Sequence, residues 1–193
     1  MLDTLDQIQR DIVARLAGGA ANRKSAVHTP IVTTADADSR VMVLRDFESA
    51  TWTLRFHTDA RSPKVSVIEA DPRVSVIAYD SESKVQLRLR GHGRIERAGP
   101  VADAAWAAGD NFSRRCYLGV EPGRPADGPT SGLPPQFERA EPSDADLVPA
   151  RQNFAVLLVE LREADWFSLA HTGHRRAIFR ADGPLWEGRW IAP

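Results

Sequence analysis

Residues 84–98 read KVQLRLRGHGRIERA, and their alternation decides the fold class. Three apolar and three polar residues alternate here, so they fall on opposite faces of an extended strand: Val85, Leu87 and Leu89 against Gln86, Arg88 and Arg90. The preceding stretch VSVIAYD, residues 74–80, is rich in β-branched residues, and residues 80–83 have the polar composition of a turn. The two stretches therefore predict an antiparallel hairpin.

Similar patterns extend in both directions from this hairpin. Residues 26–47 predict two strands separated by the turn sequence ADADS, and residues 51–59 predict a third by alternation. Residues 153–169, 174–181 and 185–192 predict three more. So many short strands favour a mainly β fold, an antiparallel barrel with peripheral helices, over a doubly wound parallel sheet.

Helices are expected at three places around this sheet. Apolar residues at helical spacing run from Leu2 to Leu16 and stop at Gly18. A short helix is expected after Ser62, a suitable N-cap, with Pro63 at its first position and a stop at Asp71. Residues 100–117 are alanine-rich and helical, whereas residues 118–152 predict a long loop, functional or mobile, within a single domain spanning 1–193.

Composition excludes several classes of function. The 25 Lys and Arg nearly balance the 26 Asp and Glu, so no overall field attracts nucleic acid or a membrane surface. The single cysteine, Cys116, excludes an internal disulfide and any multi-thiolate metal site. The acidic start MLDTLDQIQR is unlike a signal peptide, and no apolar run is long enough to cross a bilayer. We therefore expect a cytoplasmic protein without nucleic-acid or membrane partners.

Familiar catalytic motifs are weak or missing. GHGRIE, residues 91–96, has Glu96 where a dinucleotide fingerprint needs its third glycine. His171 and His174 have no carboxylate at helical spacing, so we expect no metal site. There is no G-x-S-x-G nucleophile elbow, which leaves a hydrolase as a minor alternative. The basic strand at 84–98 has no aromatic residue for base stacking, which disfavours a nucleic-acid barrel.

Dispersed polar groups instead suggest a phosphorylated ligand. Arg40 and Arg45 flank an apolar strand, and Thr58, Arg61, Ser62 and Lys64 gather at a strand-to-helix junction. Hydroxyls, cations and the amides at a helix start together form a phosphate cradle.

At these residues the chain resembles the pyridoxamine 5'-phosphate oxidase-like family, whose fold is the FMN-binding split barrel, an antiparallel Greek-key barrel with an N-terminal helix and short helices. RVMVLR, residues 40–45, resembles the family's Arg-x-x-x-x-Lys strand, with Arg45 in place of the lysine. Pro63 stands where the family has a phosphate-binding arginine, for which Arg61 is expected to compensate. Gln86 resembles the glutamine that bonds the flavin ring system.

The C-terminal residues 166–193 carry the second part of the resemblance. Trp166 takes the place of the flavin-contacting tryptophan, and TGHRR, residues 172–176, that of an Arg-x-His-x-Arg motif. His174 and Arg176 fall on its histidine and second arginine, whereas Thr172 replaces the first arginine, a substrate contact. Trp186 and the final IAP complete the match.

The resemblance implies FMN as the cofactor, held between the two subunits of a homodimer. It implies cofactor contacts from Arg40, Val41, Met42, Val43, Leu44, Arg45, His57, Thr58, Arg61, Ser62, Lys64, Gln86, Thr130, Ser131, Trp166 and Arg176. The substrate-side candidates, none of them a certain catalytic group, are His174, Arg175, Arg114 and Arg45.

The implied activity is that of an FMN-dependent oxidoreductase that oxidises a small amine or alcohol, with pyridoxamine or pyridoxine 5'-phosphate as candidate substrates. Two alternatives stay open because of Pro63 and Thr172. One is a flavin-binding sensor without turnover, and the other is a cofactor-free split barrel that serves as an interaction module.

Overall fold

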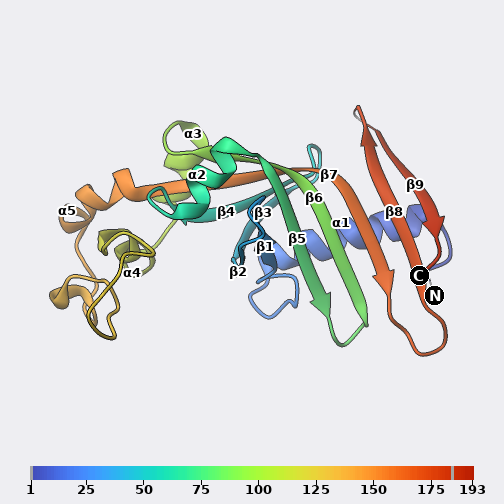
Figure 1. Ribbon diagram of the computed structural model, residues 1–193, viewed down its shortest axis with the longest axis horizontal. Coiled ribbons are helices and arrows are strands. Elements are labelled where there is room, and N and C mark those ends of the chain that lie inside the picture. The colour runs from blue at the N-terminus through green and yellow to red at the C-terminus, as the bar shows by residue number, and fades with distance from the viewer. Residues whose placement is uncertain (1, 184) are drawn as a thin grey trace.

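The longest strand, β7 (Phe154–Ser168), organises the sheet in the computed structural model, which describes residues 2–183 and 185–193. One edge of β7 pairs antiparallel with β6 (Val85–Glu96). Its other edge pairs first with β4 (Thr53–Asp59) and then with β8 (Arg175–Asp182), so the sheet branches halfway along β7. This branching gives the curled, split form seen in Figure 1.

The remaining strands extend the two branches. Beyond β6 lie β5 (Arg73–Asp80), β1 (Ile31–Thr33) and β2 (Ser39–Val41); beyond β4 lies β3 (Leu44–Glu48), and beyond β8 lies β9 (Leu185–Ile191). All neighbouring strands in the described part of the chain pair antiparallel. The predicted mainly β, antiparallel fold class with peripheral helices is confirmed.

The second strand expected within residues 26–47 is broken into β2 and β3. The amide of Met42 donates to the carbonyl of Pro30, and that of Leu44 donates to the carbonyl of His28. These bonds carry the chain from one branch of the sheet to the other while Leu44 turns into the core, where it is 1% exposed. Apolar alternation alone does not reveal such a crossing, because both halves keep extended backbone.

Helix α1 (Leu5–Ala21) covers the inner face of the sheet. It starts with a capping box between Thr4 and Gln7, and its buried Ile8, Ile12 and Leu16 join the core of the sheet. In Figure 1 the helix lies behind the strands and begins at the end of the molecule where both chain termini lie. None of the helices in the described residues is long and apolar enough to span a bilayer.

The other helices gather at the opposite end of the molecule (Figure 1). Helix α2 (Pro63–Ala70) begins after Ser62 and ends at Asp71, as predicted. The helical stretch expected at 100–117 comprises α3 (Pro100–Ala107), α4 (Asn111–Arg114) and the start of the 3-10 turn η1 (Arg115–Leu118). The predicted loop is irregular apart from η2 (Pro135–Phe137), α5 (Asp144–Leu147) and η3 (Val148–Asn153).

The outer face of the sheet exposes large apolar side chains. Val41, Ile31 and Ile77 lie side by side across β2, β1 and β5, because residues paired directly in a sheet share a face. Ile31 is 43% exposed, Val41 64% and Tyr79, on the same face of β5, 45%. These side chains form a contiguous exposed apolar patch on this face.

Candidate functional site

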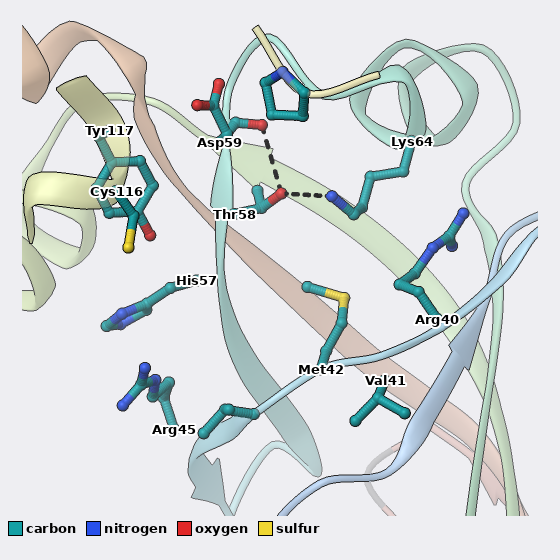
Figure 2. A pocket seen from close by; sticks show the side chains of 12 residues that line it. Arg40, Val41, Met42, Arg45, His57, Thr58, Asp59, Lys64, Cys116 and Tyr117 are labelled. Atoms are coloured by element: carbon teal, nitrogen blue, oxygen red, sulfur yellow. Dashed lines mark hydrogen bonds between the residues drawn. The ribbon is translucent and has the colours of Figure 1, made fainter. Parts of the chain in front are cut away.

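A cavity of about 370 Å³ lies where the β2–β3 connection, the end of β4, the start of α2 and η1 meet. Figure 2 shows Arg40 and Lys64 at one end, Arg45 and His57 at the other, and Met42 between them. Predicted site residues that line it are Arg40, Val41, Met42, Val43, Arg45, His57, Thr58 and Lys64. The fold therefore brings together one group of the predicted residues that are spread over 25 positions, from 40 to 64.

Lys64 is the central cation at one end of the cavity. Its ammonium donates to the hydroxyls of Thr58 at 3.1 Å and Ser62 at 2.6 Å, and both hydroxyl-bearing residues are buried. Burial, followed by the nearby Arg40, lowers the pKa of Lys64 from its ordinary value. Lys64 has no carboxylate partner within the described chain, so this desolvated cation is arranged to receive an anion.

Arg40 provides the second cation at this end. Its guanidinium donates to the Thr34 hydroxyl at 3.0 Å and is ion-paired with the exposed Asp38. With Lys64 and Thr58 it offers several charge-assisted donors within one cavity. This donor set fits a phosphate monoester, the charged end of FMN.

The other end of the cavity is built on a β-bulge. Leu44 pairs with Phe56 and Asp46 with Arg55, so Arg45 is the extra residue that the ladder skips. A bulge re-aims side chains, and Arg45 points into the cavity beside His57. Burial, with Arg45 and Arg55 nearby, lowers the pKa of His57 to about 4, so its imidazole is neutral at pH 7.

Three predicted cofactor residues near this cavity, Leu44, Arg61 and Ser62, do not line it. Leu44 is packed in the core, so its side chain offers no ligand contact. Arg61 donates to both carboxylate oxygens of Asp59 and to the Gly119 carbonyl, and therefore it does not supply the charge missing at Pro63. The hydroxyl of Ser62 accepts a hydrogen bond from the Lys64 ammonium and so helps to position that cation at the cavity.

The weaker matches in the loop and in α4 also lie outside this cavity. Thr130 and Ser131 are exposed; their hydroxyls accept from the backbone amides of Gly132 and Leu133, two residues along the chain. Arg114 donates to the carbonyls of Trp106 and Ala107, each at 2.8 Å, and so caps the end of α3. Local hydrogen bonds therefore account for these three side chains.

Gln86 and Arg176 meet on the outer face of the sheet, outside the cavity. Gln86 pairs with Phe167, and Phe167 pairs with Arg176, so the three residues form one row across β6, β7 and β8. The Arg176 guanidinium lies 5.8 Å from the centre of the Phe167 ring. β6 is three strands from β2 in the sheet, a distance of roughly 14 Å.

Trp166 points the other way from this row. It is 3% exposed, belongs to the core, and its indole nitrogen donates to Asp11 of α1 at 2.8 Å. Successive residues of a strand face opposite sides, so Phe167, and not Trp166, lies on the face that carries Gln86 and Arg176. The assignment of Trp166 is corrected on this geometry, because spacing along the chain does not report which face a residue occupies.

Arg176 is anchored by a buried carboxylate. Asp165, 2% exposed, accepts from Arg176 at 2.8 and 3.1 Å and from Arg88 at 2.6 Å. The hydrogen bond to Asp165 raises the pKa of Arg176. This pairing fixes the guanidinium on the outer face.

The substrate-side candidates His174 and Arg175 line a second cavity, of about 310 Å³, near the chain ends. Arg175 donates to the Leu2 carbonyl and is ion-paired with Asp3. Among the described residues, no three His, Cys, Asp or Glu side chains gather as a metal site requires.

Sequence reasoning missed several residues that line the first cavity. Asp59, Cys116, Tyr117 and Pro122 contribute to its wall. Tyr117 packs edge-on against Phe154, and burial raises the pKa of its phenol. The sequence pointed only to Asp59, because it lies between the predicted site residues Thr58 and Arg61. The other three belong to η1 and to the loop that follows it, which fold onto the cavity from a distant part of the chain.

Comparisons with known proteins agree with this arrangement. Residues 15–97 match the family described as pyridoxamine 5'-phosphate oxidase, FMN-binding domain. The chain is 28% identical over 138 residues to pyridoxine/pyridoxamine 5'-phosphate oxidase 2 of Arabidopsis thaliana. That match covers 68% of this chain and 66% of the plant protein, just under two thirds of its length.

Two solved structures share the fold. A pyridoxamine 5'-phosphate oxidase-related, FMN-binding protein from Nostoc punctiforme superposes with a TM-score of 0.75 at 22% identity, covering 95% of this chain and 97% of its own. PhzG from Burkholderia lata, solved in complex with tetrahydrophenazine-1-carboxylic acid, gives a TM-score of 0.68 at 15% identity, covering 100% and 94%.

The curled antiparallel sheet is the split-barrel fold that these solved structures share, and a cavity lined by Arg40, Thr58 and Lys64 lies at the start of α2. The donor set around Lys64 matches the phosphate of FMN. The chain is similar to the pyridoxamine 5'-phosphate oxidase-like family over residues 15–97, and this match to an FMN-binding domain supports FMN as the cofactor.

Proposed function

We propose that the protein is a homodimeric, FMN-dependent oxidoreductase that oxidises a small amine or alcohol substrate, with pyridoxamine or pyridoxine 5'-phosphate as the first candidates. The observation that carries this proposal is the two-ended cavity, with Lys64 and Arg40 at one end and Arg45 and His57 at the other. The first end suits the cofactor phosphate, which leaves the second for the ring and the substrate. FMN supplies the redox chemistry, and the chain orients the reactants.

The dimer is part of the proposal because the predicted contacts lie in two separate places. The row formed by Gln86, Phe167 and Arg176 is not part of the cavity that holds Lys64. The exposed Ile31 and Tyr79 on the same outer face support a second copy seated there. In such a dimer the row of one copy would complete the cavity of the other.

The dimer is tested by placing a charge on the outer face. Ile31→Asp should give a monomer in light scattering and should weaken FMN retention, because half of each site would be lost. Val148→Asp is the matched control, since Val148 is 73% exposed and directly follows α5, away from the strands of the sheet. A variant Ile31→Asp that stays dimeric would contradict this interface.

The flavin contacts are tested by measuring FMN affinity. Lys64→Met removes a charged donor, which should weaken binding by about 1.5 to 3 kcal/mol, roughly 10- to 150-fold. Lys24→Met, at an exposed position, is the control. Phe167→Ala should weaken binding by about three- to ten-fold through loss of aromatic contact. Unchanged affinity in both Lys64→Met and Phe167→Ala would refute the site.

The activity is tested by anaerobic mixing of FMN-loaded protein with pyridoxamine 5'-phosphate. Bleaching of the oxidised-flavin band, with recovery on admission of oxygen, would establish an oxidase. A band that persists with this and with other amine and alcohol donors would contradict the proposed activity.

A flavin-binding protein without turnover is the second candidate. One observation favours it: Thr172 stands in place of a substrate-contacting arginine, and Arg175, three residues along the chain, is engaged by Leu2 and Asp3. The same anaerobic experiment separates the two, because such a protein would hold FMN and show no bleaching.

A further inference from the structure

One wall of the cavity that holds Lys64 comes from a distant part of the chain. Cys116 and Tyr117 of η1, and Pro122 of the loop that follows, line this wall. In Figure 2, Cys116 and Tyr117 lie across the cavity from Arg40. The wall is not part of the sheet, so its place depends on the hydrogen bonds that tie it to other elements.

Arg61 makes the first of these ties, from the strand-to-helix junction between β4 and α2. Its guanidinium donates to the Gly119 carbonyl at 3.0 Å and to the two carboxylate oxygens of Asp59 at 3.0 and 2.7 Å. Asp59 also accepts from the Arg61 backbone amide at 2.8 Å, which fixes this local arrangement. Gly119 is buried, and a charged donor on a buried carbonyl makes a strong hydrogen bond.

Asn153, the last residue of η3, makes the second tie. Its side-chain amide donates to the Tyr117 carbonyl at 2.9 Å, and its own carbonyl accepts from the Ala60 amide at 2.7 Å. Asn153 therefore bridges the wall and the same strand-to-helix junction. The wall is held at two positions, 117 and 119, by residues that do not themselves line the cavity.

The segment that continues from Gly119 runs past Pro63. A Cβ at Gly123 would lie 3.6 Å from the Pro63 ring, so the two residues are in contact. Gly123 has a φ of 87°, a left-handed conformation that glycine adopts without strain. Pro63 stands where the family resemblance places a phosphate-binding arginine. This chain therefore has a packed segment at the phosphate end of its cavity where a further cation is expected.

We propose that Arg61 and Asn153 are positioning residues for the cofactor, which hold residues 117–123 closed against the phosphate end of the cavity and so slow the release of FMN. This role rests on the proposed function, because FMN is the ligand that the wall retains. Lys64 and Arg40 attract the phosphate, whereas the wall limits its departure.

The test measures FMN release and association by the anisotropy of flavin fluorescence, after dilution and after stopped-flow mixing. The variants are Arg61→Met, Arg61→Lys and Asn153→Ala. Arg73→Met is the matched control, because Arg73 is also paired with an aspartate two residues earlier, Asp71, which accepts from its backbone amide at 3.1 Å. The Arg73 side chain is 75% exposed, and within residues 2–183 and 185–193 its guanidinium bonds only Asp71.

We expect Arg61→Met to speed FMN release at least about ten-fold and to change the association rate by less than about threefold, because the wall opens while Lys64 and Arg40 remain. Asn153→Ala should speed release about three- to ten-fold, since a neutral hydrogen bond is weaker. Arg61→Lys should fall between, because it keeps the charge and loses the planar fork. Unchanged release in both Arg61→Met and Asn153→Ala, or equal acceleration in Arg73→Met, would overturn the positioning role.

A second effect of Arg61→Met has to be separated from opening of the wall. The Asp59 carboxylate lines the cavity and is 10% exposed, and without Arg61 its charge would repel the cofactor phosphate. Asp59→Asn combined with Arg61→Met removes that charge. The double variant should release FMN as fast as Arg61→Met alone. A return to the unmodified rate would assign the effect to charge and overturn the positioning role.

Hydrogen exchange with mass spectrometry reports on the wall without any cofactor. The Val120 amide donates to the Gly132 carbonyl at 2.8 Å, so opening of this segment exposes a protected amide. Peptides covering residues 117–123 should exchange faster in Arg61→Met and Asn153→Ala than in the unmodified protein, and unchanged exchange would overturn the inference. Failure of the proposed function gives a different pattern, in which the unmodified protein does not retain FMN while exchange still depends on Arg61 and Asn153.

Discussion

Replacing Asp165 should destabilise the protein far more than replacing Glu163, which lies two residues away on the same strand. Asp165→Asn removes the carboxylate charge that Arg88 and Arg176 share, and this carboxylate is 2% exposed. Breaking a buried ion pair costs about 3 to 5 kcal/mol, because the remaining charge is left without a partner. The two arginine side chains are 33% and 25% exposed and regain some hydration, so we expect a loss of about 3 kcal/mol.

Glu163 supplies a matched comparison two residues away. It also bridges two arginines, Arg90 and Arg180, but their side chains are 62% and 58% exposed. Glu163 itself is 13% exposed, but ion pairs to such exposed partners contribute about 0 to 1 kcal/mol, so Glu163→Gln should cost about 1 kcal/mol or less. The difference between the two variants isolates the effect of burial.

The measurement is urea unfolding of both variants, supported by thermal unfolding. For a domain of 193 residues, a loss of about 3 kcal/mol lowers the melting temperature by roughly 6 to 12 °C. Asp165→Asn should show this shift, and Glu163→Gln should shift by no more than about 4 °C. Equal losses in the two variants would refute the reasoning that burial of Asp165 makes its ion pairs important.

Three further predictions concern the cavity wall, the sheet and the core. His57 has a pKa of about 4 when folded, against 6.5 as the ordinary value, so the unfolded chain gains its proton first on acidification. The neutral His57 therefore stabilises the folded protein fully above pH 6.5, and this stabilisation is lost as the pH falls to about 4. The free energy of unfolding in urea should differ between pH 7 and pH 4 by about 2 to 3 kcal/mol less in His57→Gln than in the unmodified protein. An unchanged pH dependence would contradict this. Gly91→Ala should cost about 1 to 3 kcal/mol or more in thermal unfolding, because its Cβ would lie 2.2 Å from the Glu160 carbonyl oxygen, and a neutral result would contradict the close approach. Trp166→Phe should cost about 1 kcal/mol for the lost bond to Asp11 and leave FMN affinity unchanged; weaker FMN binding would return the flavin contact to Trp166.

The parts of the fold that could be predicted from sequence are those with a local cause. The alternation at 84–98 specifies a two-faced strand, and Ser62 followed by Pro63 specifies a helix start. Lys64 and Thr58 follow from that start, because a strand end and a helix beginning lie close in space. These residues meet in the cavity as the spacing indicated.

The parts that could not be predicted depend on register and on distant contacts. Trp166 and Phe167 are adjacent in sequence, and only their pairing with β6 and β8 decides which one faces outward. Arg61 and Arg114 have the right chemistry for a ligand, yet a carboxylate and two backbone carbonyls engage them. Arg23 and Arg55 belong to no motif, yet the fold places both on one cleft of about 580 Å³.

The bulge at Arg45 separates ligand selection from folding. A residue that the ladder skips contributes no cross-strand pair, so its side chain can change without altering the hydrogen bonds that hold β3 to β4. Arg45 lines both the cavity that holds Lys64 and the cleft beside it. Exchange of this one residue would therefore change the charge that the cavity presents to a ligand. The pairing of β3 with β4 on either side of the bulge would stay the same.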